Sequence, residues 1–384
     1  MIAVSSLLGV RRSASDALRY GRDRPGERVP PSSAARRPVV VWNVTRACNL
    51  ACRHCYASAK RLPARGELSN DEARRFLDDL AGYGVPAVLV SGGEPLSRPD
   101  LLDLIGYGTG IGLRFTLSTN GTLIDRPTAH ALERAGLVYA GVSIDGPAEL
   151  HDRLRCQQGA WDASLDGIRN LAAAGVRRGV RFTLTPQTLD GLDRVLELVE
   201  QERIERFCLY HLVPSGRGRT LDDVTAGERR SALERVFSFA DTHPEIEVLT
   251  VDNPSDGPAL LRWLEGRDRE RAVRCGEMLA WNAGARFGPG VALANVDELG
   301  DVHPDQFSRH HTVGNVRRRP FSEIWGTPSD QYLISLRTEN RPLPARCAAC
   351  AWASLCGGGF RARAELATGD PWAFDPSCSL PAPA

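Results

Sequence analysis

Short apolar runs and helical periods alternate along the chain from residue 39 onward. The runs are rich in Val, Ile, Leu and Phe and are bounded by glycine, proline or polar residues, which is typical of buried strands. The segments between them carry apolar residues three and four positions apart, which predicts amphipathic helices. The predicted strands are residues 39–44, 85–90, 113–118, 138–144, 180–185 and 207–213, and predicted helices begin at residue 70 and near residues 125, 161 and 190.

The helix that follows Ser69 has a clear start signal. Glu72 stands three residues after Ser69, and this spacing is a capping box, in which each side chain bonds the backbone N–H of the other residue. The apolar residues that follow at helical spacing predict its buried face: Ala73, Phe76, Leu77 and Leu80.

Strands that alternate with helices at this spacing indicate βαβ units and a parallel sheet. Six units precede Pro214, fewer than the eight that close a barrel, so the sequence predicts an α/β fold with an open, partial (β/α)6 TIM-like barrel. Residues 226–266 are predicted to be mostly helical, with one further strand at 247–251. The functional residues are expected at the C-terminal ends of the strands.

Composition and charge exclude some functions. The 384 residues include 48 Lys and Arg against 47 Asp and Glu, which argues against a nucleic-acid binder held by bulk charge. No apolar stretch reaches about eighteen residues, so no membrane span is expected. The apolar run at residues 1–8 lacks a basic start and a cleavage site, so we interpret it as a docking extension.

The ten cysteines are grouped rather than spread. Seven fall at 48–55 and 347–378, whereas Cys156, Cys208 and Cys275 stand alone. A secreted disulfide framework is a small, cysteine-dense domain, unlike this chain. The grouping therefore predicts metal binding in a reducing cytoplasm.

Cys48, Cys52 and Cys55 follow directly on the first predicted strand. Three thiolates can hold three irons of a 4Fe-4S cluster and leave the fourth iron open to an outside ligand. An open position is what separates catalytic from purely structural metal sites. A structural zinc site, or three unrelated thiols, is the alternative interpretation.

Small and polar residues end the next three strands. Gly92 and Gly93 would let a ligand approach the backbone, and Glu94 could accept hydrogen bonds from an ammonium group. Polar side chains that could bond a ribose stand at the following two strand ends, although each group could equally be a polar turn: Ser118, Asn120, Ser143 and Asp145.

A second group of four cysteines lies near the C-terminus, at Cys347, Cys350, Cys356 and Cys378. Four thiolates complete a closed metal site. Zinc and an iron–sulfur cluster both suit such a set, and the spacing alone leaves the two open.

The C-x3-C-x2-C spacing, with Gly-Gly-Glu-Pro about forty residues later, resembles the signature of the radical S-adenosylmethionine superfamily. The resemblance implies that S-adenosylmethionine binds the open iron and yields a 5′-deoxyadenosyl radical. It implies that the Gly92–Glu94 stretch binds the methionine end of the cofactor and that Arg155 pairs with the cofactor carboxylate. The family usually has glycine after this arginine, where this chain has Cys156.

The C-terminal group resembles the SPASM and twitch auxiliary-cluster regions. Full SPASM domains carry seven cysteines, whereas this chain has Asp305 and Phe360 where two ligands are expected. The resemblance therefore implies two 4Fe-4S clusters, one that binds S-adenosylmethionine and one auxiliary. The implied organisation is an arm at 1–38, the partial barrel at 39–214, a helical linker region at 215–274 and the auxiliary-cluster domain at 275–384.

Three further stretches, at 209–218, 303–325 and 369–372, resemble the NirJ and AhbC enzymes of haem d1 and haem biosynthesis. These enzymes remove propionate or acetate side chains from sirohaem-derived tetrapyrroles such as didecarboxysirohaem. The candidate ligands for such an anionic, iron-bearing substrate are His211, Arg217, Arg219 and His303, with His310 and His311 nearby. Pro214-Ser215 and Pro254 depart from the pattern in segments expected to face substrate.

Two other functions stay open. One is a SPASM-type maturase that modifies a ribosomal peptide, although residues 1–38 are too short for the usual peptide-binding module. The other is a non-catalytic iron–sulfur sensor, which would not need Gly92–Glu94 at a strand end. The enzyme interpretation adds an external electron donor such as a flavodoxin or ferredoxin, and expects neither nucleic acid nor membrane as a partner.

Overall fold

A curved, mainly parallel sheet forms the centre of the computed structural model, which describes residues 1–13, 16, 20, 36–281, 288–338 and 341–381. The described residues form an 11-stranded sheet in the order β1-β8-β7-β6-β5-β4-β3-β2-β9-β10-β11. Its parallel strands are β2 (Val39–Thr45), β3 (Val88–Gly92), β4 (Phe115–Thr119), β5 (Tyr139–Ser143), β6 (Arg178–Leu184), β7 (Arg206–His211), β8 (Glu247–Val251) and β9 (Leu293–Val296).

The predicted α/β fold with an open barrel is confirmed. The six predicted strands correspond to β2–β7, and the further strand at 247–251 is β8, which pairs with β7 in parallel. On the other side β9 pairs with β2 in parallel. Hydrogen bonding therefore carries the sheet beyond six strands at both ends of the barrel.

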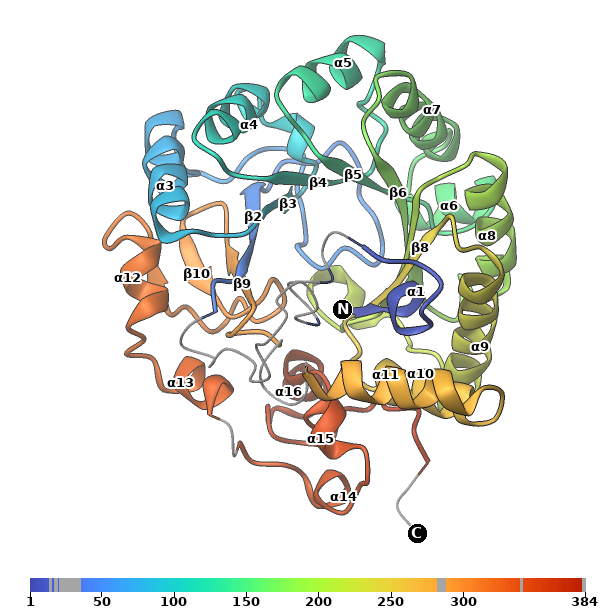
Figure 1. The fold of residues 1–384 in the computed structure, drawn as a ribbon. Helices are drawn as coiled ribbons and strands as arrows, with labels where there is room; N and C mark the ends of the chain where they lie inside the picture. The colour runs from blue at the N-terminus through green and yellow to red at the C-terminus, as the bar shows by residue number, and fades with distance from the viewer. Residues whose placement is uncertain (14–15, 17–19, 21–35, 282–287, 339–340, 382–384) are drawn as a thin grey trace.

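Helices follow the strands and ring the outside of the curved sheet (Figure 1). They are α3 (Asn70–Tyr83), α4 (Leu101–Gly110), α5 (Arg126–Arg134), α6 (Ala148–Arg155), α7 (Ala160–Ala173), α8 (Leu192–Gln201), α9 (Ala226–Thr242), α10 (Asp256–Glu265) and α11 (Arg269–Trp281), with 3-10 turns at Pro95–Ser97, Leu189–Gly191 and Gly216–Thr220. The capping box at Ser69 and Glu72 is present, and the buried face of α3 is the predicted one.

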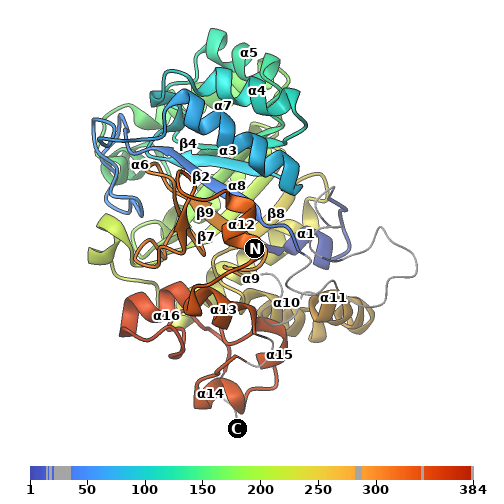
Figure 2. The same cartoon turned by 90° about the vertical axis from the view of Figure 1, so that its left-hand side faces the viewer.

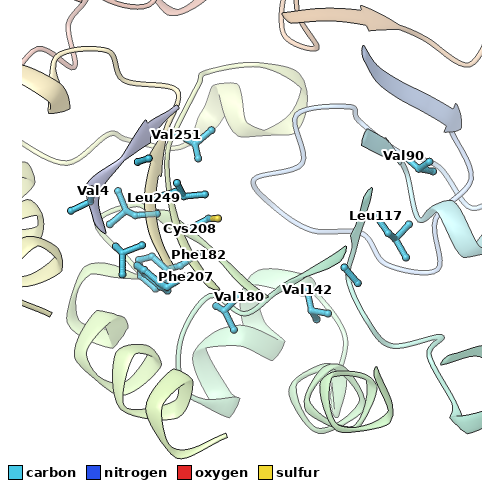
Figure 3. Packing of buried hydrophobic residues seen from close by; sticks show 14 of the residues in the cluster. Val4, Val90, Leu117, Val142, Val180, Phe182, Phe207, Cys208, Leu249 and Val251 are labelled. Carbon is cyan, nitrogen blue, oxygen red and sulfur yellow. The ribbon is translucent and has the colours of Figure 1, made fainter. Parts of the chain in front are cut away.

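Successive side chains of each strand lie in two different environments, the hydrophobic core and the inside of the barrel. On β6, Val180 and Phe182 join the hydrophobic core that the sheet shares with the helices, together with Val142 of β5 and Phe207 of β7 (Figure 3). The residues between them on the strands face the inside of the barrel, because successive side chains of a strand point to opposite faces. The outer face is apolar and packs against helices, which leaves the inner face free for polar chemistry.

The first residues of the chain pack against the open edge of the barrel. β1 (Ile2–Ala3) pairs antiparallel with β8, and α1 (Val4–Leu7) follows at once. Val4, Leu7 and Leu8 are buried in the main core. The apolar N-terminal run thus lies on the barrel, while most of the predicted arm lies outside the described residues.

The antiparallel β10 (Asp301–His303) and β11 (Gly314–Asn315) extend the sheet beyond β9, and α12 (Phe321–Gly326) packs against α3. The remaining C-terminal helices form a layer beside the barrel (Figure 2): α13 (Gln331–Arg337), α14 (Ala345–Ala348), α15 (Ala353–Cys356) and α16 (Arg361–Thr368). The segment 215–274, which the sequence predicts as a helical linker region, contributes α9, β8 and α10 to the barrel itself. Among the described residues, none of the helices has the length and apolar character needed to cross a bilayer.

Cys156 occupies the position where glycine is usual in the family that the sequence resembles, and the backbone explains that preference. Cys156 ends α6 in the left-handed conformation, with φ +56° and ψ +36°. A side chain in this region costs about 1 kcal/mol because its Cβ crowds the backbone. The chain therefore keeps the expected turn but holds it with a strained residue.

We expect Cys156→Gly to stabilise the protein by up to about 1 kcal/mol, because glycine relieves the crowded Cβ at this φ. Cys156→Ala is the matched control: it removes the exposed thiol but keeps the Cβ, and should leave the free energy of unfolding nearly unchanged. Chemical denaturation of the three proteins measures both. A stabilisation by alanine equal to that by glycine would show that the thiol, not the backbone, is responsible.

Candidate functional site

A large cavity opens at the C-terminal ends of the barrel strands. It encloses about 1000 Å³ including the part open to solvent, the upper end of the range for small-molecule sites. Its wall contains the three cysteines of the first motif, the glycines that end β3, and residues from the ends of β4, β5, β6 and β7. The cavity can therefore hold a metal centre and a small molecule side by side.

The cysteine loop lies at one side of this cavity. Cys48, Cys52 and Cys55 all line it, and none forms a disulfide. The backbone N–H of Leu50 lies 3.4 Å from Cys48 Sγ, and that of Ala59 lies 3.4 Å from Cys55 Sγ. Such N–H donors stabilise thiolate charge, and hydrogen bonds to sulfur also tune a bound cluster.

Cys48 and Cys52 lie where a thiolate is disfavoured. Burial, together with the neighbouring Glu94, Cys52 and Cys55, raises the pKa of Cys48 to about 12 although the N–H of Leu50 opposes the shift, and burial also raises the pKa of Cys52. Bound iron supplies the missing positive charge, since a coordinating thiol is deprotonated. The donor set therefore fits a cluster held by three cysteines.

The glycines at the end of β3 serve the protein's own backbone. A Cβ on Gly93 would lie 2.1 Å from the carbonyl oxygen of Ala47, and one on Gly92 would lie 2.5 Å from that of Thr45. The N–H of Gly93 donates to Thr45 at 2.8 Å and the N–H of Glu94 to Ala47 at 2.8 Å. The sequence predicts glycine here for access by a ligand, and the structure adds that only glycine lets β3 approach the strand that carries the cysteine loop.

The loop after β7 also holds the cysteine loop in place. Gly216 has φ +53°, and a Cβ there would lie 2.5 Å from the carbonyl oxygen of Cys55. The guanidinium group of Arg217 donates to the carbonyl oxygens of Cys52 and Ala59, each at 2.8 Å. Arg217, a predicted substrate ligand, lines the cavity and is oriented by these two bonds to the cysteine loop, while its Nη2 has no hydrogen-bond partner.

Glu94 is buried and ties two strand ends together. Its carboxylate accepts from Thr119 Oγ1 at 2.8 Å, from the N–H of Asn120 at 2.8 Å and from the N–H of Leu96 at 3.2 Å. Burial raises the pKa of Glu94 while these donors oppose the shift. Glu94 itself is not among the residues that line the cavity, so its contact with a ligand ammonium group stays a prediction.

Arg155 reaches the cavity from the end of α6. Its Nε and Nη2 lie 2.8 and 2.5 Å from Asp145 Oδ2, and its Nη1 lies 3.7 Å from Cys52 Sγ. Burial opposes the ionisation of Asp145, but Arg155 and His54 outweigh it and lower the pKa of the carboxyl to about 2. Asp145, predicted to contact a ribose, lies behind Arg155 and orients the guanidinium group instead of lining the cavity.

Three of the predicted ribose contacts do reach the cavity: Ser118, Asn120 and Ser143. Asn120 is held by Asn49 of the cysteine loop, whose Oδ1 accepts from its Nδ2 at 2.8 Å. The end of β4 is thus joined to the cysteine loop through this pair. The positions of these side chains stay compatible with the predicted role.

The four C-terminal cysteines surround a second, smaller cavity of about 390 Å³. A single zinc ion with bonds of about 2.3 Å would hold its sulfur ligands about 3.8 Å apart. Among the residues that the structure describes, no three cysteine sulfurs all lie within 4.8 Å of one another. This wider spacing favours a cluster, in which each cysteine binds a different iron.

The departures from a seven-cysteine pattern are explained by packing. Cys275 is fully buried in the main core on α11, away from the second cavity. Asp305 accepts from the N–H groups of Phe307 and Ser308 at 2.7 and 2.9 Å. Phe360 packs edge-on against Phe307 at 5.8 Å between ring centroids. Neither position offers a thiolate.

Three predicted substrate ligands are either engaged by protein groups or lie outside the cavity lining. His211 lines the cavity, but its Nε2 lies 2.7 Å from Asp256 and its Nδ1 accepts from Arg229 at 3.3 Å. His303 is buried, with Nδ1 at 3.0 Å from the carbonyl oxygen of His311. Arg219 is exposed and does not line the cavity. Of the three, only His211 reaches the cavity, whereas His303 and Arg219 do not line it, so the predicted convergence on the opening is not seen for those two.

The structure adds Arg181, which the sequence analysis missed. Arg181 lies on the inner face of β6 and lines the cavity, with its guanidinium carbon 4.3 Å from the centre of the Tyr210 ring. Within the described residues it has no ion-pair or hydrogen-bond partner. A Cβ on Gly141 would lie 2.9 Å from Arg181 Cδ, so the neighbouring strand makes room for this side chain. The sequence signal that could have identified Arg181 is a charged residue within the apolar pattern of a strand.

Comparisons with known proteins agree with this arrangement. Residues 42–199 match the radical SAM superfamily, and residues 292–351 match SPASM, an iron–sulfur cluster-binding domain. The Fe-coproporphyrin III synthase of Methanosarcina barkeri is 44% identical, covering 99% of this chain and 98% of that protein. The pre-heme d1 synthase of Dinoroseobacter shibae is 39% identical, covering 90% of this chain and 87% of that protein.

Solved structures share the fold at lower identity. SuiB of Streptococcus suis bound to the precursor peptide SuiA superposes with a TM-score of 0.72 at 18% identity, covering 90% of this chain and 76% of SuiB. The same protein has been solved bound to S-adenosylmethionine. The likeness extends over the barrel and the C-terminal region, and it shows the fold.

We expect anaerobically reconstituted protein to contain about eight irons, because three and four cysteines can each hold one 4Fe-4S cluster. Replacing Cys48, Cys52 and Cys55 together by alanine should leave about half of this iron. Cys156→Ala is the control and should retain all of it, since this exposed thiol lines neither cavity. Iron and zinc analysis is the measurement; zinc in place of iron at the C-terminal cysteines would contradict the auxiliary cluster.

Replacing Glu94 by alanine should weaken S-adenosylmethionine binding about tenfold or more while both clusters survive. The change removes a charged acceptor and frees the N–H of Asn120, and lost hydrogen bonds to charged groups cost about 1.5–3 kcal/mol. Equilibrium binding and the yield of 5′-deoxyadenosine measure the effect. Glu94→Gln keeps part of the hydrogen bonding, so its affinity for S-adenosylmethionine should lie between those of the wild type and Glu94→Ala. Wild-type cleavage by the alanine variant would exclude a role of Glu94 in binding.

Proposed function

The chain is a member of the radical S-adenosylmethionine superfamily with a SPASM domain, and we propose that its substrate is a carboxylate-bearing iron tetrapyrrole. Like its relatives, the enzyme uses S-adenosylmethionine and 4Fe-4S clusters. When bound, these groups supply a carbon-centred radical that abstracts hydrogen from the substrate. The protein supplies position, charge and exclusion of water.

The observation that carries the substrate proposal is Arg181. Among the described residues no carboxylate forms an ion pair with Arg181, and Asp252, which lines the same cavity, interacts with it only at longer range. The guanidinium group can therefore bind a carboxylate of the substrate through two parallel N–H···O bonds. Sirohaem derivatives carry several such groups around their ring, whereas a neutral peptide offers none.

The rest of the wall on this side suits a flat aromatic ring with polar edges. Tyr210 and Phe307 line it with aromatic faces, and Thr183 and Gln306 line it with polar groups. The Tyr210 ring lies under Arg181 and restricts the directions in which the guanidinium group can point. A tetrapyrrole could therefore be held by its carboxylates at the edge and by aromatic contacts on its faces.

The cysteine loop, Arg155 and the ends of β4 and β5 line the same cavity. We assign these residues to the metal centre and S-adenosylmethionine: Cys48, Cys52 and Cys55 as cluster ligands, Gly92, Gly93 and Glu94 at the methionine end, and Ser118, Asn120, Ser143 and Arg155 around the cofactor. Asp145 positions Arg155. The four C-terminal cysteines hold the auxiliary cluster in this proposal.

Each reductive cleavage of the cofactor requires one electron. We assign its delivery to an external donor of the flavodoxin or ferredoxin type. The close relatives named for haem and heme d1 synthesis support a tetrapyrrole, and the fold shared with SuiB makes a peptide the competing substrate.

We expect didecarboxysirohaem to bind the reconstituted protein with a shift of its visible absorption bands, and Arg181→Gln to weaken this binding about tenfold to a hundredfold. The size follows from the loss of a charge-assisted bond worth about 1.5–3 kcal/mol. Arg178→Gln is the control on the same strand: Arg178 pairs with Glu205 outside the cavity, so its loss should leave binding unchanged. Anaerobic titration measures both.

Two outcomes would contradict the proposal at different points. Equal binding by wild type and Arg181→Gln would remove Arg181 from the substrate site. Stimulation of cofactor cleavage by a short peptide, with no response to any tetrapyrrole, would exclude the tetrapyrrole as substrate and leave the radical chemistry in place.

A further inference from the structure

Two adjacent histidines and a glutamate meet on the C-terminal layer, outside both cavities described above. His310 Nε2 lies 3.0 Å from Glu365 Oε2, and His311 Nε2 lies 2.8 Å from Glu365 Oε1. One ligand atom from each of the three residues lies within 4.8 Å of the others, and they are the only such group among the described residues. The histidines lie in the loop between β10 and β11, and Glu365 lies on α16.

The group is held in place by its surroundings. The His311 ring stacks on Tyr332, with centroids 3.8 Å apart and planes 20° apart. The carbonyl oxygen of His311 lies 3.0 Å from His303 Nδ1, which fixes the backbone of the pair. The donors therefore need little reorganisation to bind a ligand together.

Glu365 carries an unsatisfied atom at the centre of this group. Its Oε2 is shielded from water and has no hydrogen-bond partner, because His310 approaches at 3.0 Å without the geometry of a hydrogen bond. Burying an acceptor without a partner is costly. A cation between Glu365 and the two imidazoles would satisfy this oxygen and both Nε2 atoms at once.

We propose that His310, His311 and Glu365 bind a divalent transition metal ion, with zinc as the natural candidate. Two imidazoles and one carboxylate are ligands of this class of ion, whereas calcium and magnesium prefer oxygen ligands alone. Bonds of about 2.0–2.1 Å in a tetrahedron place ligand atoms about 3.3 Å apart, close to the 3.0 and 2.8 Å between each histidine nitrogen and a Glu365 oxygen, and all three ligand atoms already lie within 4.8 Å of one another.

The ion would have three protein ligands and one open position. His310 is 43% exposed at its side chain, so the fourth position faces solvent. The site differs from the iron–sulfur sites in its donors and does not rest on the proposed substrate. Glu365 lies on α16, and Phe360 at the start of this helix packs on Phe307 at the cavity wall. The ion would therefore join the loop at 308–311 to this helix.

The test uses protein whose clusters are already loaded, so that the cysteines are occupied. After treatment with a mild chelator, equilibrium dialysis against zinc chloride should show one zinc per chain with iron content unchanged. His311→Ala and Glu365→Gln should each weaken zinc binding at least tenfold. His130→Ala, an exposed histidine on α5, is the matched control and should bind zinc like the wild type.

A second measurement separates a site from a simple loss of packing. Zinc should slow amide hydrogen exchange in α16 of the wild type and of His130→Ala, and should have no effect in Glu365→Gln. Wild-type protein that binds no zinc would overturn the proposal. Zinc that binds Glu365→Gln as tightly as the wild type would overturn it as well, because the ion would then lie elsewhere.

Discussion

Close backbone contact around the cysteine loop is the constraint on which the rest of the site depends. The loop has little regular structure of its own, so neighbouring strand ends must hold it. Gly92 and Gly93 approach it from β3, and Gly216 approaches from the loop after β7, at distances that leave no room for a Cβ. Arg217 adds two bonds to its carbonyl oxygens. Burial raises the pKa of Cys48 and of Cys52, and the backbone, not the thiols, keeps the three cysteines together.

The division of the sheet into two faces explains how one scaffold holds both a large core and a polar cavity. Residues such as Val142, Val180 and Phe182 bury the outer face against the helices (Figure 3). The inner face can then carry Arg181 and Thr183 without disturbing that core. Because successive side chains of a strand point to opposite faces, one short segment can carry both polar residues that line the cavity and apolar residues that stabilise the core. Gly141 completes the arrangement by leaving space for Arg181 on the neighbouring strand.

The C-terminal layer is joined to the barrel by buried charge. Arg363 is 1% exposed, pairs with Asp375 at 3.0 Å and donates to the carbonyl oxygen of Leu212 at the end of β7 at 3.0 Å. Burying a charged pair is favourable only when its remaining donors are also satisfied, and here backbone oxygens of the barrel satisfy them. This network relates the segment that carries Cys378 to the wall of the cavity. The network can therefore hold the auxiliary-cluster region at a constant distance from the wall of the cavity.

Much of this protein was determined by patterns local in the sequence. The strands β2–β7, the capping box at Ser69 and the two cysteine groups follow from periodicity and spacing, because each depends on neighbours within a few residues. Cys156 shows the limit of such patterns: the sequence shows only that a cysteine replaces the usual glycine, and the backbone angles show that it adopts a left-handed conformation. The position of β9 beside β2, and of the N-terminal residues on β8, depends on pairing between distant segments and was not predicted.

Tertiary structure decided which polar residues serve the cavity. His211, Arg217 and His303 have the right chemistry for an anionic substrate, but Asp256, the carbonyl oxygens of the cysteine loop and the backbone of His311 already engage them. Arg181 becomes significant because the fold places it in the cavity wall without an ion-pair partner among the described residues, although Asp252 lines the same cavity. Sequence shows which groups a residue carries. Whether those groups are free depends on what the fold places within about 3 Å of them, because a satisfied hydrogen bond or ion pair is no longer available to a ligand.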